Sequence, residues 1–277
     1  KLGQNVSDAF PEGDLFVNCG HPSNVKHSIE RFIHLIFGYP FYSPAKSELS
    51  MFFAHAAGLQ SADLSRQVGA AIIGEPFKVL SVGCNEVPAP CGGPYWPGEG
   101  YDANTLHKNK IMKQILGRLE AFGWLKNGLF EKTSSDPIIP QLSDEERKVF
   151  KDIQLFDLLE FGRPVHAEMM AITTAARSGR KLQNAALYCT TFPCHNCARH
   201  IVSSGISEVV YIEPYPKSKV KELYGDSIAV DMSGKVEGKV NFTPFEGVSP
   251  NRFRELFYFG KGARKEKSGR AKEWSVE

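Results

Sequence analysis

Three side chains in the second half of the sequence, His166, Cys194 and Cys197, are of the types that zinc prefers as ligands. The two cysteines lie three residues apart at the expected start of a helix, and this spacing lets both sulfurs face one ion. A helix N-terminus also favours the thiolate form of a cysteine. A structural zinc site uses four protein ligands, whereas a catalytic site uses three and keeps one position for water. The sequence therefore predicts one catalytic Zn²⁺ held by these three residues.

Glu168 follows His166 by two residues, so its carboxylate is expected beside the metal without being a ligand. Bound zinc lowers the pKa of water to about 7, and a neighbouring carboxylate can take the water proton and pass it to a substrate nitrogen. The two motifs, His166–Glu168 and Pro193–Cys197, together read H-x-E and P-C-x-x-C, which is the pattern of zinc-dependent nucleobase deaminases. Two alternatives stay open: a structural zinc site with His195 or another residue as the fourth ligand, and a pair of buried cysteines without metal.

Alternating strands and helices are expected to position these motifs, and such alternation is typical of an α/β layered domain with a central sheet. Strands are predicted at 68–73, 79–84, 185–190, 208–212 and 239–243. Helices are predicted at about 47–64, 166–178, 195–204 and 218–224. Residues 85–101 are rich in Pro and Gly and predict a loop, and residues 102–160 predict a charged helical insertion with Ile111, Ile115, Leu119 and Phe122 on one face.

The first part of the chain predicts a strand and a helix within residues 12–37. Asn24 is of a type that caps helices. The expected apolar face of this helix comprises Val25, Ile29, Phe32, Ile33 and Ile36. One strand and one helix cannot bury a core by themselves.

Composition narrows the class of protein further. The 277 residues are 42% hydrophobic and 23% charged, as in ordinary globular proteins. The sequence has no apolar run long enough to cross a membrane and no visible signal peptide, so a cytoplasmic location is expected. Six cysteines are too few for a disulfide scaffold. A second metal site among Cys19, His21, His27, Cys84 and Cys91 would match no firm zinc template.

The net charge of +2 does not indicate nucleic-acid binding, although residues 252–272 are strongly basic. This basic end is interpreted either as a solvated tail or as a segment whose first part reaches a polyphosphate or an RNA. Lys217, Arg252 and Arg254 are the candidates for binding a triphosphate, and Tyr215 and Trp96 for packing on the base or sugar. The alternative for each of them is an ordinary surface or core residue.

The sequence resembles the cytidine deaminase superfamily, and within it the deoxycytidylate branch, in the stretches Ser65–Ile72 and Val82–Glu86. The resemblance implies that Asn85 binds the sugar of the substrate. Glu86 stands where that family usually has Gly.

A closer resemblance is to the bacterial anti-phage dCTP deaminases. It covers nearly the whole chain and rests on Phe32–Gly38, Ser61–Gly69, Gly93–Trp96, Pro193–Ala198, Glu213–Ser218 and Phe245–Phe253. It implies a three-layer α-β-α fold with a mixed sheet in a deaminase domain at 46–277. Residues 1–45 would be the remnant of an upstream P-loop kinase-like domain and its linker.

The same resemblance implies deamination of dCTP, and also of dCMP, with nucleotide depletion during phage infection as the cellular role. A homo-oligomer and a regulatory RNA are the implied partners, and no membrane is expected. The alternatives are a housekeeping dCMP deaminase, a deaminase of cytosine in nucleic acid, and an inactive zinc module that binds RNA or a protein. Glu168 argues against the last, because a purely structural site has no need of that carboxylate.

Overall fold

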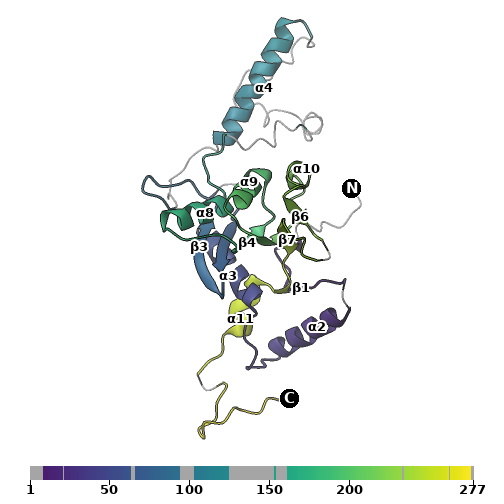
Figure 1. Cartoon of the computed structure of the whole chain (residues 1–277), viewed down its shortest axis with the longest axis vertical. Helices are drawn as coiled ribbons and strands as arrows, with labels where there is room; N and C mark the ends of the chain where they lie inside the picture. The colour runs from purple at the N-terminus through teal and green to yellow at the C-terminus, as the bar shows by residue number, and fades with distance from the viewer. Residues whose placement is uncertain are drawn as a thin grey trace. The chain divides into compact units, whose positions relative to one another are not determined.

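The protein was analysed as a computed structural model, which describes residues 9–20, 22–63, 66–93, 103–124, 153, 161–232, 234–261 and 263–275. The chain divides into two compact units (Figure 1). One comprises Lys1–Asn85 together with His166–Glu277, and the other comprises Glu86–Val165. The predicted metal ligands all belong to the first unit.

A six-stranded mixed sheet forms the centre of the first unit, with the strand order β3-β2-β4-β5-β7-β6. The strands are β2 (Gly69–Gly74), β3 (Lys78–Cys84), β4 (Ala186–Thr191), β5 (Glu208–Glu213), β6 (Ile228–Val230) and β7 (Val240–Pro244). β2 pairs antiparallel with β3 and β4, whereas β4, β5, β7 and β6 run parallel. The predicted mixed sheet of an α/β fold is confirmed, and five strands lie where the sequence places them.

Helices cover both faces of this sheet. Tyr188 on β4 packs against the cluster that contains Met51 and Ala54 of α3 (Lys46–Gly58). The next residue, Cys189, lies close enough to Glu168 of α8 (Ala167–Arg177) for the carboxylate to raise the pKa of its thiol. Because successive side chains of a strand point to opposite faces, α3 and α8 lie on opposite sides. α9 (His195–Ser203) contacts α8 on the second side (Figure 1). The three-layer arrangement is therefore confirmed.

Two glycines let the helices approach the sheet closely. A Cβ atom on Gly69 would lie 1.8 Å from the carbonyl oxygen of Ala54 in α3, and one on Gly83 would lie 2.4 Å from the amide nitrogen of Ala171 in α8. Both distances are shorter than any real contact, so only glycine fits at these positions. Gly83 fixes how closely α8, whose first turn carries Glu168, lies against the sheet.

α3 differs from its prediction in length and in the face that it buries. It ends at Gly58 rather than near Leu64, because the chain turns there into a loop that hydrogen bonds hold beside the end of β3. The buried face contains Glu48, Ser50, Met51, Ala54, Ala57 and Gly58. The apolar residues at helical spacing in the sequence predict a different face, of which Ala57 is buried and Ala56 is exposed; that face comprises Leu49, Phe52, Phe53, Ala56 and Ala57. Small residues prevail because the helix backbone packs directly on β2.

The N-terminal strand and helix pack on the last part of the chain. β1 (Leu15–Phe16) pairs antiparallel with β8 (Gly247–Val248). Leu35 of α2 (Pro22–Ile36) packs with Val248 and with Leu256 of α11 (Phe253–Phe257), which follows the short helix η2 (Pro250–Arg252). The predicted apolar face of α2 was wrong in part, because Leu35 is buried while Ile29 and Ile33 are 43% and 44% exposed. The helix begins at Pro22, before the proposed cap Asn24.

A buried ion pair joins this N-terminal helix to α3. The Arg31 guanidinium donates to both carboxylate oxygens of Glu48, at 2.7 and 2.9 Å. The same carboxylate accepts hydrogen bonds from the backbone amides of Ala45 and Val248. Each of its two oxygens therefore accepts two hydrogen bonds. Such a fully hydrogen-bonded pair fixes how α2 attaches to α3. Removing one partner would leave a buried charge without its counterion.

The second unit contains α4 (Ala103–Ala121) and an antiparallel bridge between Glu86 and Val165. The predicted apolar face of this segment was wrong, since Met112 and Leu116 are buried whereas Ile115 and Phe122 are exposed. Two short elements of the first unit, β6 and β8, were not predicted, and α10 (Val220–Leu223) lies within its predicted range. Within the described ranges, every helix is too short or too polar to cross a membrane.

Candidate metal and catalytic site

The first turns of α8 and α9 carry the predicted site. His166 is the N-cap residue of α8 and Cys194 is the N-cap residue of α9, both with extended backbone. Their carbonyl oxygens accept the first helical hydrogen bonds, from Met170 and Ala198. Neither side chain caps its own helix, so both are available to face each other. Cys197 follows one turn into α9 and lies on the same side.

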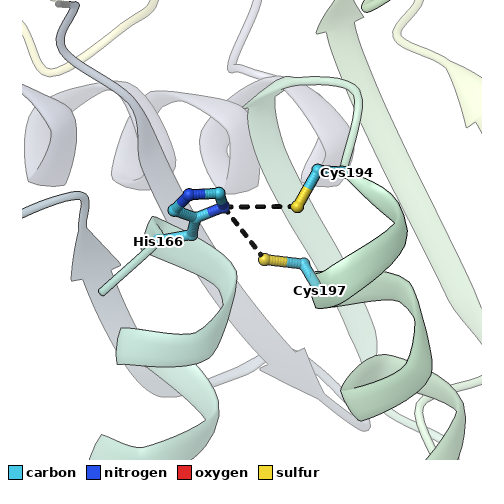
Figure 2. A group of neighbouring side chains, drawn as sticks. All are labelled: His166, Cys194 and Cys197. Atoms are coloured by element: carbon cyan, nitrogen blue, oxygen red, sulfur yellow. Dashed lines mark hydrogen bonds between the residues drawn. The ribbon is translucent and has the colours of Figure 1, made fainter. Parts of the chain in front are cut away.

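His166, Cys194 and Cys197 converge on one point (Figure 2). The Nδ1 atom of His166 lies 3.3 Å from Sγ of Cys194 and 3.5 Å from Sγ of Cys197. All three ligand atoms lie within 4.8 Å of one another, and both cysteines are buried. His166 at the start of α8 thus meets Cys194 at the start of α9, and Cys197 joins them from one turn further along α9. The spacing of the two motifs predicts this convergence.

The three side chains of this cluster shift one another's pKa values. The hydrogen bond from Cys197 and that with His166 lower the pKa of Cys194 to about 4, against the opposing effect of burial. The hydrogen bond with Cys194 raises the pKa of His166 to about 9. The pKa of Cys197 is raised, because its thiol proton is held by Cys194 and its surroundings are dry. Zn²⁺ would replace the protons that these groups share, and one nitrogen and two sulfurs are ligand types that it prefers.

Glu168 lies beside the cluster. Its Oε2 atom accepts a hydrogen bond from Sγ of Cys197 at 3.5 Å, and only 4% of the residue is exposed. Burial raises the pKa of this carboxyl group. A raised pKa favours the protonated form of a carboxyl group, and general acid–base catalysis requires a group that both accepts and gives up a proton.

Asn85, the residue expected to bind a sugar, holds the loop before β2. Its Oδ1 atom accepts from the amide of Val68 at 2.7 Å, and its Nδ2 atom donates to the carbonyl oxygen of Arg66 at 2.8 Å. A carboxamide carries two donor hydrogens and two lone pairs, so these bonds use half of its capacity. Its contact with a sugar stays a prediction.

The segment 213–218, which carries Tyr215 and Lys217, is tied to the residues just before Cys194. The amide of Phe192 donates to the carbonyl oxygen of Glu213 at 2.7 Å, and the hydroxyl of Ser218 donates to that of Pro193 at 2.9 Å. These bonds place Tyr215 and Lys217 on a loop next to the metal cluster. Lys217 is exposed and Tyr215 is half-buried.

Arg252 occupies a different setting. Its guanidinium donates to Asp14 at 2.7 Å and to Glu255 at 2.9 Å, so it bridges the N-terminal segment and α11. A role in binding phosphate, which stays a prediction, would require it to leave these carboxylates. Arg254 is exposed on α11. Trp96 lies outside the described residues.

Two residues near the site were not predicted as functional. Asp63 lies close enough to His166 to raise the pKa of the imidazole electrostatically, and Arg66 lies over Tyr215. Neither shows a recognisable motif spacing, because a loop brings them to the cluster from far away in the sequence. For the proposed second metal site, Cys19, His27, Cys84 and Cys91 do not form a ligand group in the described part of the chain, and His21 lies outside it.

A pocket of about 140 Å³ lies next to α3 and not over the metal cluster. His55, Gly58, Gln67, Thr190 and Glu213 line it, with aromatic residues of the N-terminal segment. None of its lining residues is a candidate zinc ligand. The candidate site is therefore defined by the three converging side chains and not by this pocket.

Proteins that place H-x-E and P-C-x-x-C motifs in this way form the class of zinc-dependent nucleobase deaminases. The comparison with known families agrees. Residues 45–213 match the model of the cytidine and deoxycytidylate deaminase zinc-binding region, and the chain belongs to this family.

Similar proteins bear the name deoxycytidylate deaminase. The enzyme of Enterobacteria phage T2 is 47% identical over 55 residues, which are 20% of this chain and 29% of the phage enzyme. The probable deoxycytidylate deaminase of Drosophila melanogaster is 33% identical over 144 residues, which are 48% of this chain and 66% of the fly protein. The chain thus spans less than a third of the phage enzyme and about two thirds of the fly protein.

Among solved structures, the dCMP deaminase of cyanophage S-TIM5 in complex with dCMP and dUMP is similar to this chain. The match covers 74% of this chain and all of that one, with 16% identity and a TM-score of 0.42.

Proposed function

We propose that the protein hydrolyses the 4-amino group of cytosine in a free deoxycytidine nucleotide. Water adds at C4 and ammonia leaves, so that dCTP or dCMP becomes the corresponding uracil nucleotide. The observation that carries this proposal is the buried Glu168 carboxyl group beside three converging zinc ligands. A purely structural metal site has no use for such a carboxyl group.

The residues of the chain have separate tasks in this reaction. His166, Cys194 and Cys197 would hold Zn²⁺, which activates a water molecule when it is bound. Glu168 takes one proton of the attacking water at Oε2 and delivers it to the ring nitrogen, and it then takes the second proton of that water and passes it to the leaving amine. Burial raises the pKa of this carboxyl group, which favours its protonated form.

The proposed substrate contacts surround this centre. Asn85 would orient the sugar, and Tyr215 and Trp96 would pack on the base or sugar. Lys217 and Arg252 would contact the phosphates. Lys217 lies on a loop that is bonded to the segment leading into Cys194, and a role for Arg252 would require it to leave Asp14 and Glu255.

The test is to incubate the purified, zinc-loaded chain with dCTP, dCMP, CTP, deoxycytidine and a cytosine-containing oligonucleotide. Ammonia release and chromatography of the uracil products report turnover of each. We expect the deoxynucleotides to be converted fastest. Preference for the oligonucleotide would overturn the substrate assignment, and no turnover of any compound would overturn the activity.

A second candidate is a dCMP deaminase of ordinary pyrimidine metabolism, which the names of the phage and fly relatives favour. The ratio of kcat/KM for dCTP to that for dCMP separates the two. A ratio well above one supports a dCTP deaminase, and a ratio well below one supports the second candidate.

The wider biological proposals rest on the resemblance to anti-phage dCTP deaminases. One proposal is that the enzyme is cytoplasmic and depletes deoxycytidine nucleotides during phage infection. Another is that it forms a homo-oligomer. A third is that a regulatory RNA controls it, or an upstream kinase-like domain of which residues 1–45 are the remnant. Nucleotide pools measured in infected cells that carry the active protein or its Glu168→Gln variant test the cellular role. Light scattering tests the oligomer.

A further inference from the structure

Residues 61–63 and 66–68, which precede β2, are hydrogen-bonded to one another and to the proposed sugar-binding residue. The Ser61 hydroxyl donates to the carbonyl oxygen of Asn85 at 2.6 Å, and the Gln67 side chain donates to the carbonyl oxygen of Ser61 at 2.8 Å. The Asn85 side chain in turn binds the backbone of Arg66 and of Val68. The backbone of Arg66 is therefore fixed directly by the residue that would orient the sugar.

The Arg66 side chain extends from this loop to the segment that is tied to the zinc cysteines. Its guanidinium carbon lies 5.2 Å from the centre of the Tyr215 ring, which is a cation–π contact. The Nη1 atom of Arg66 lies 3.9 Å from Oε2 of Glu213, which is within ion-pair range but too far for a hydrogen bond. Glu213 is bonded through its backbone to Phe192, two residues before Cys194.

This setting suits an anion that arrives with the substrate. The contact with Tyr215 holds the guanidinium over the ring, and 45% of the Arg66 side chain is exposed. A planar guanidinium with five N–H donors can bind a phosphate through two parallel hydrogen bonds, which the ammonium group of lysine cannot do. Glu213 balances the positive charge without occupying those donors at hydrogen-bonding distance.

We infer that Arg66, whose guanidinium lies over Tyr215 and whose backbone is anchored by Asn85, binds the phosphate nearest the sugar and thereby selects nucleotides over nucleosides. The inference rests on the proposed function and deepens it by naming the group that discriminates between substrate classes. It makes Arg66 a specificity-determining residue, since the proton transfers at C4 belong to Glu168.

The competing explanation is that Arg66 only joins the loop 61–68 to the loop 213–218. A purely structural role would impair nucleotide and nucleoside turnover alike. The experiment therefore compares dCMP, dCTP and deoxycytidine in the zinc-loaded full chain, with wild type, Arg66→Gln, Arg66→Lys and Arg180→Gln. Arg180 is an exposed arginine after α8 and serves as the charge-matched control.

We expect Arg66→Gln to lower the ratio of kcat/KM for dCMP to that for deoxycytidine by about 10- to 100-fold, the usual effect of losing one charge-assisted hydrogen-bonded pair. The loss should fall mainly on KM for the nucleotides. Arg66→Lys should recover only part of it, because the two-point contact is missing, and Arg180→Gln should match wild type. If deoxycytidine turns over too slowly, the rise in KM for dCMP at nearly constant kcat makes the same distinction.

An unchanged ratio in Arg66→Gln, or a fall in kcat with unchanged KM, would overturn the inference while leaving the deaminase proposal intact. A wild-type protein that deaminates none of the three compounds would overturn both. Zinc content measured on each variant separates a loss of phosphate recognition from a disrupted site, and an Arg66→Gln protein that loses its zinc would assign Arg66 to the structural role.

Discussion

At the scale of single residues, Glu168 is the group on which turnover should depend most. It contacts Cys197 but is not one of the three converging ligands, so Glu168→Gln should keep its zinc. We expect kcat to fall by about 10²- to 10⁴-fold, the usual contribution of a positioned acid–base group. Steady-state kinetics and elemental analysis on the same preparation check both halves of the prediction. Activity near that of wild type would show that another group moves the proton.

Cys194 should be needed for the metal itself. Cys194→Ala removes the sulfur whose pKa is lowered to about 4, and two remaining ligands hold zinc weakly. The variant should therefore lose both bound zinc and activity. Cys19→Ala, which removes an exposed thiol far away in the sequence, is the matched control and should keep both. Full zinc content in Cys194→Ala would mean that the metal lies elsewhere.

The sequence was most informative about these residues. Each ligand sits in a short motif at the start of a predicted helix, so local structure and chemistry could be inferred together. Asp63 and Arg66 could not be found in this way. Their approach to the site depends on hydrogen bonds between Asn85 and a loop about 20 residues earlier, and no local pattern encodes such a contact.

At the scale of elements, the close packing of α8 on β3 should control the geometry of the metal site. Gly83→Ala would place a Cβ atom 2.5 Å from the carbonyl oxygen of Ala167, the residue next to His166. We expect a loss of about 1–3 kcal/mol in the free energy of unfolding, as for other overpacked cores, together with weaker zinc binding. Urea unfolding and a zinc-chelator competition measure the two effects.

Gly260→Ala is the control for this substitution, because no atom lies within 4 Å of the added Cβ. It should change neither quantity. Equal stability and zinc affinity of Gly83→Ala and wild type would show that α8 can shift without cost.

Strands and helices with clear periodicity were predicted well, whereas helix faces and ends were not. The burial of Leu35 in place of Ile29 follows from the pairing of β1 with β8, which joins residues more than 200 positions apart. The end of α3 at Gly58 follows from the hydrogen bonds that hold the next loop beside the end of β3. β6 is only three residues long, and a segment that short carries little periodic signal.

At the scale of the whole first unit, the Arg31–Glu48 pair should make α2 part of the cooperative fold. Arg31→Met would leave the buried Glu48 carboxylate without its cation, and we expect a loss of about 3–5 kcal/mol in the free energy of unfolding. Lys26→Met removes an exposed member of an ion pair on the same helix and should change stability by less than about 0.5 kcal/mol. Similar stabilities of the two variants, measured by urea unfolding, would show that α2 is only loosely attached.

The pairing of β1 with β8 has a practical consequence for anyone who wishes to produce a minimal catalytic fragment. A cut at residue 46, the boundary that family resemblance suggests, would strip β8 of its partner and remove the cation of Glu48. The truncated chain would expose an open strand edge, and such edges promote self-association. Soluble fragments should therefore begin upstream of Leu15, even though every candidate zinc ligand lies more than 140 residues later.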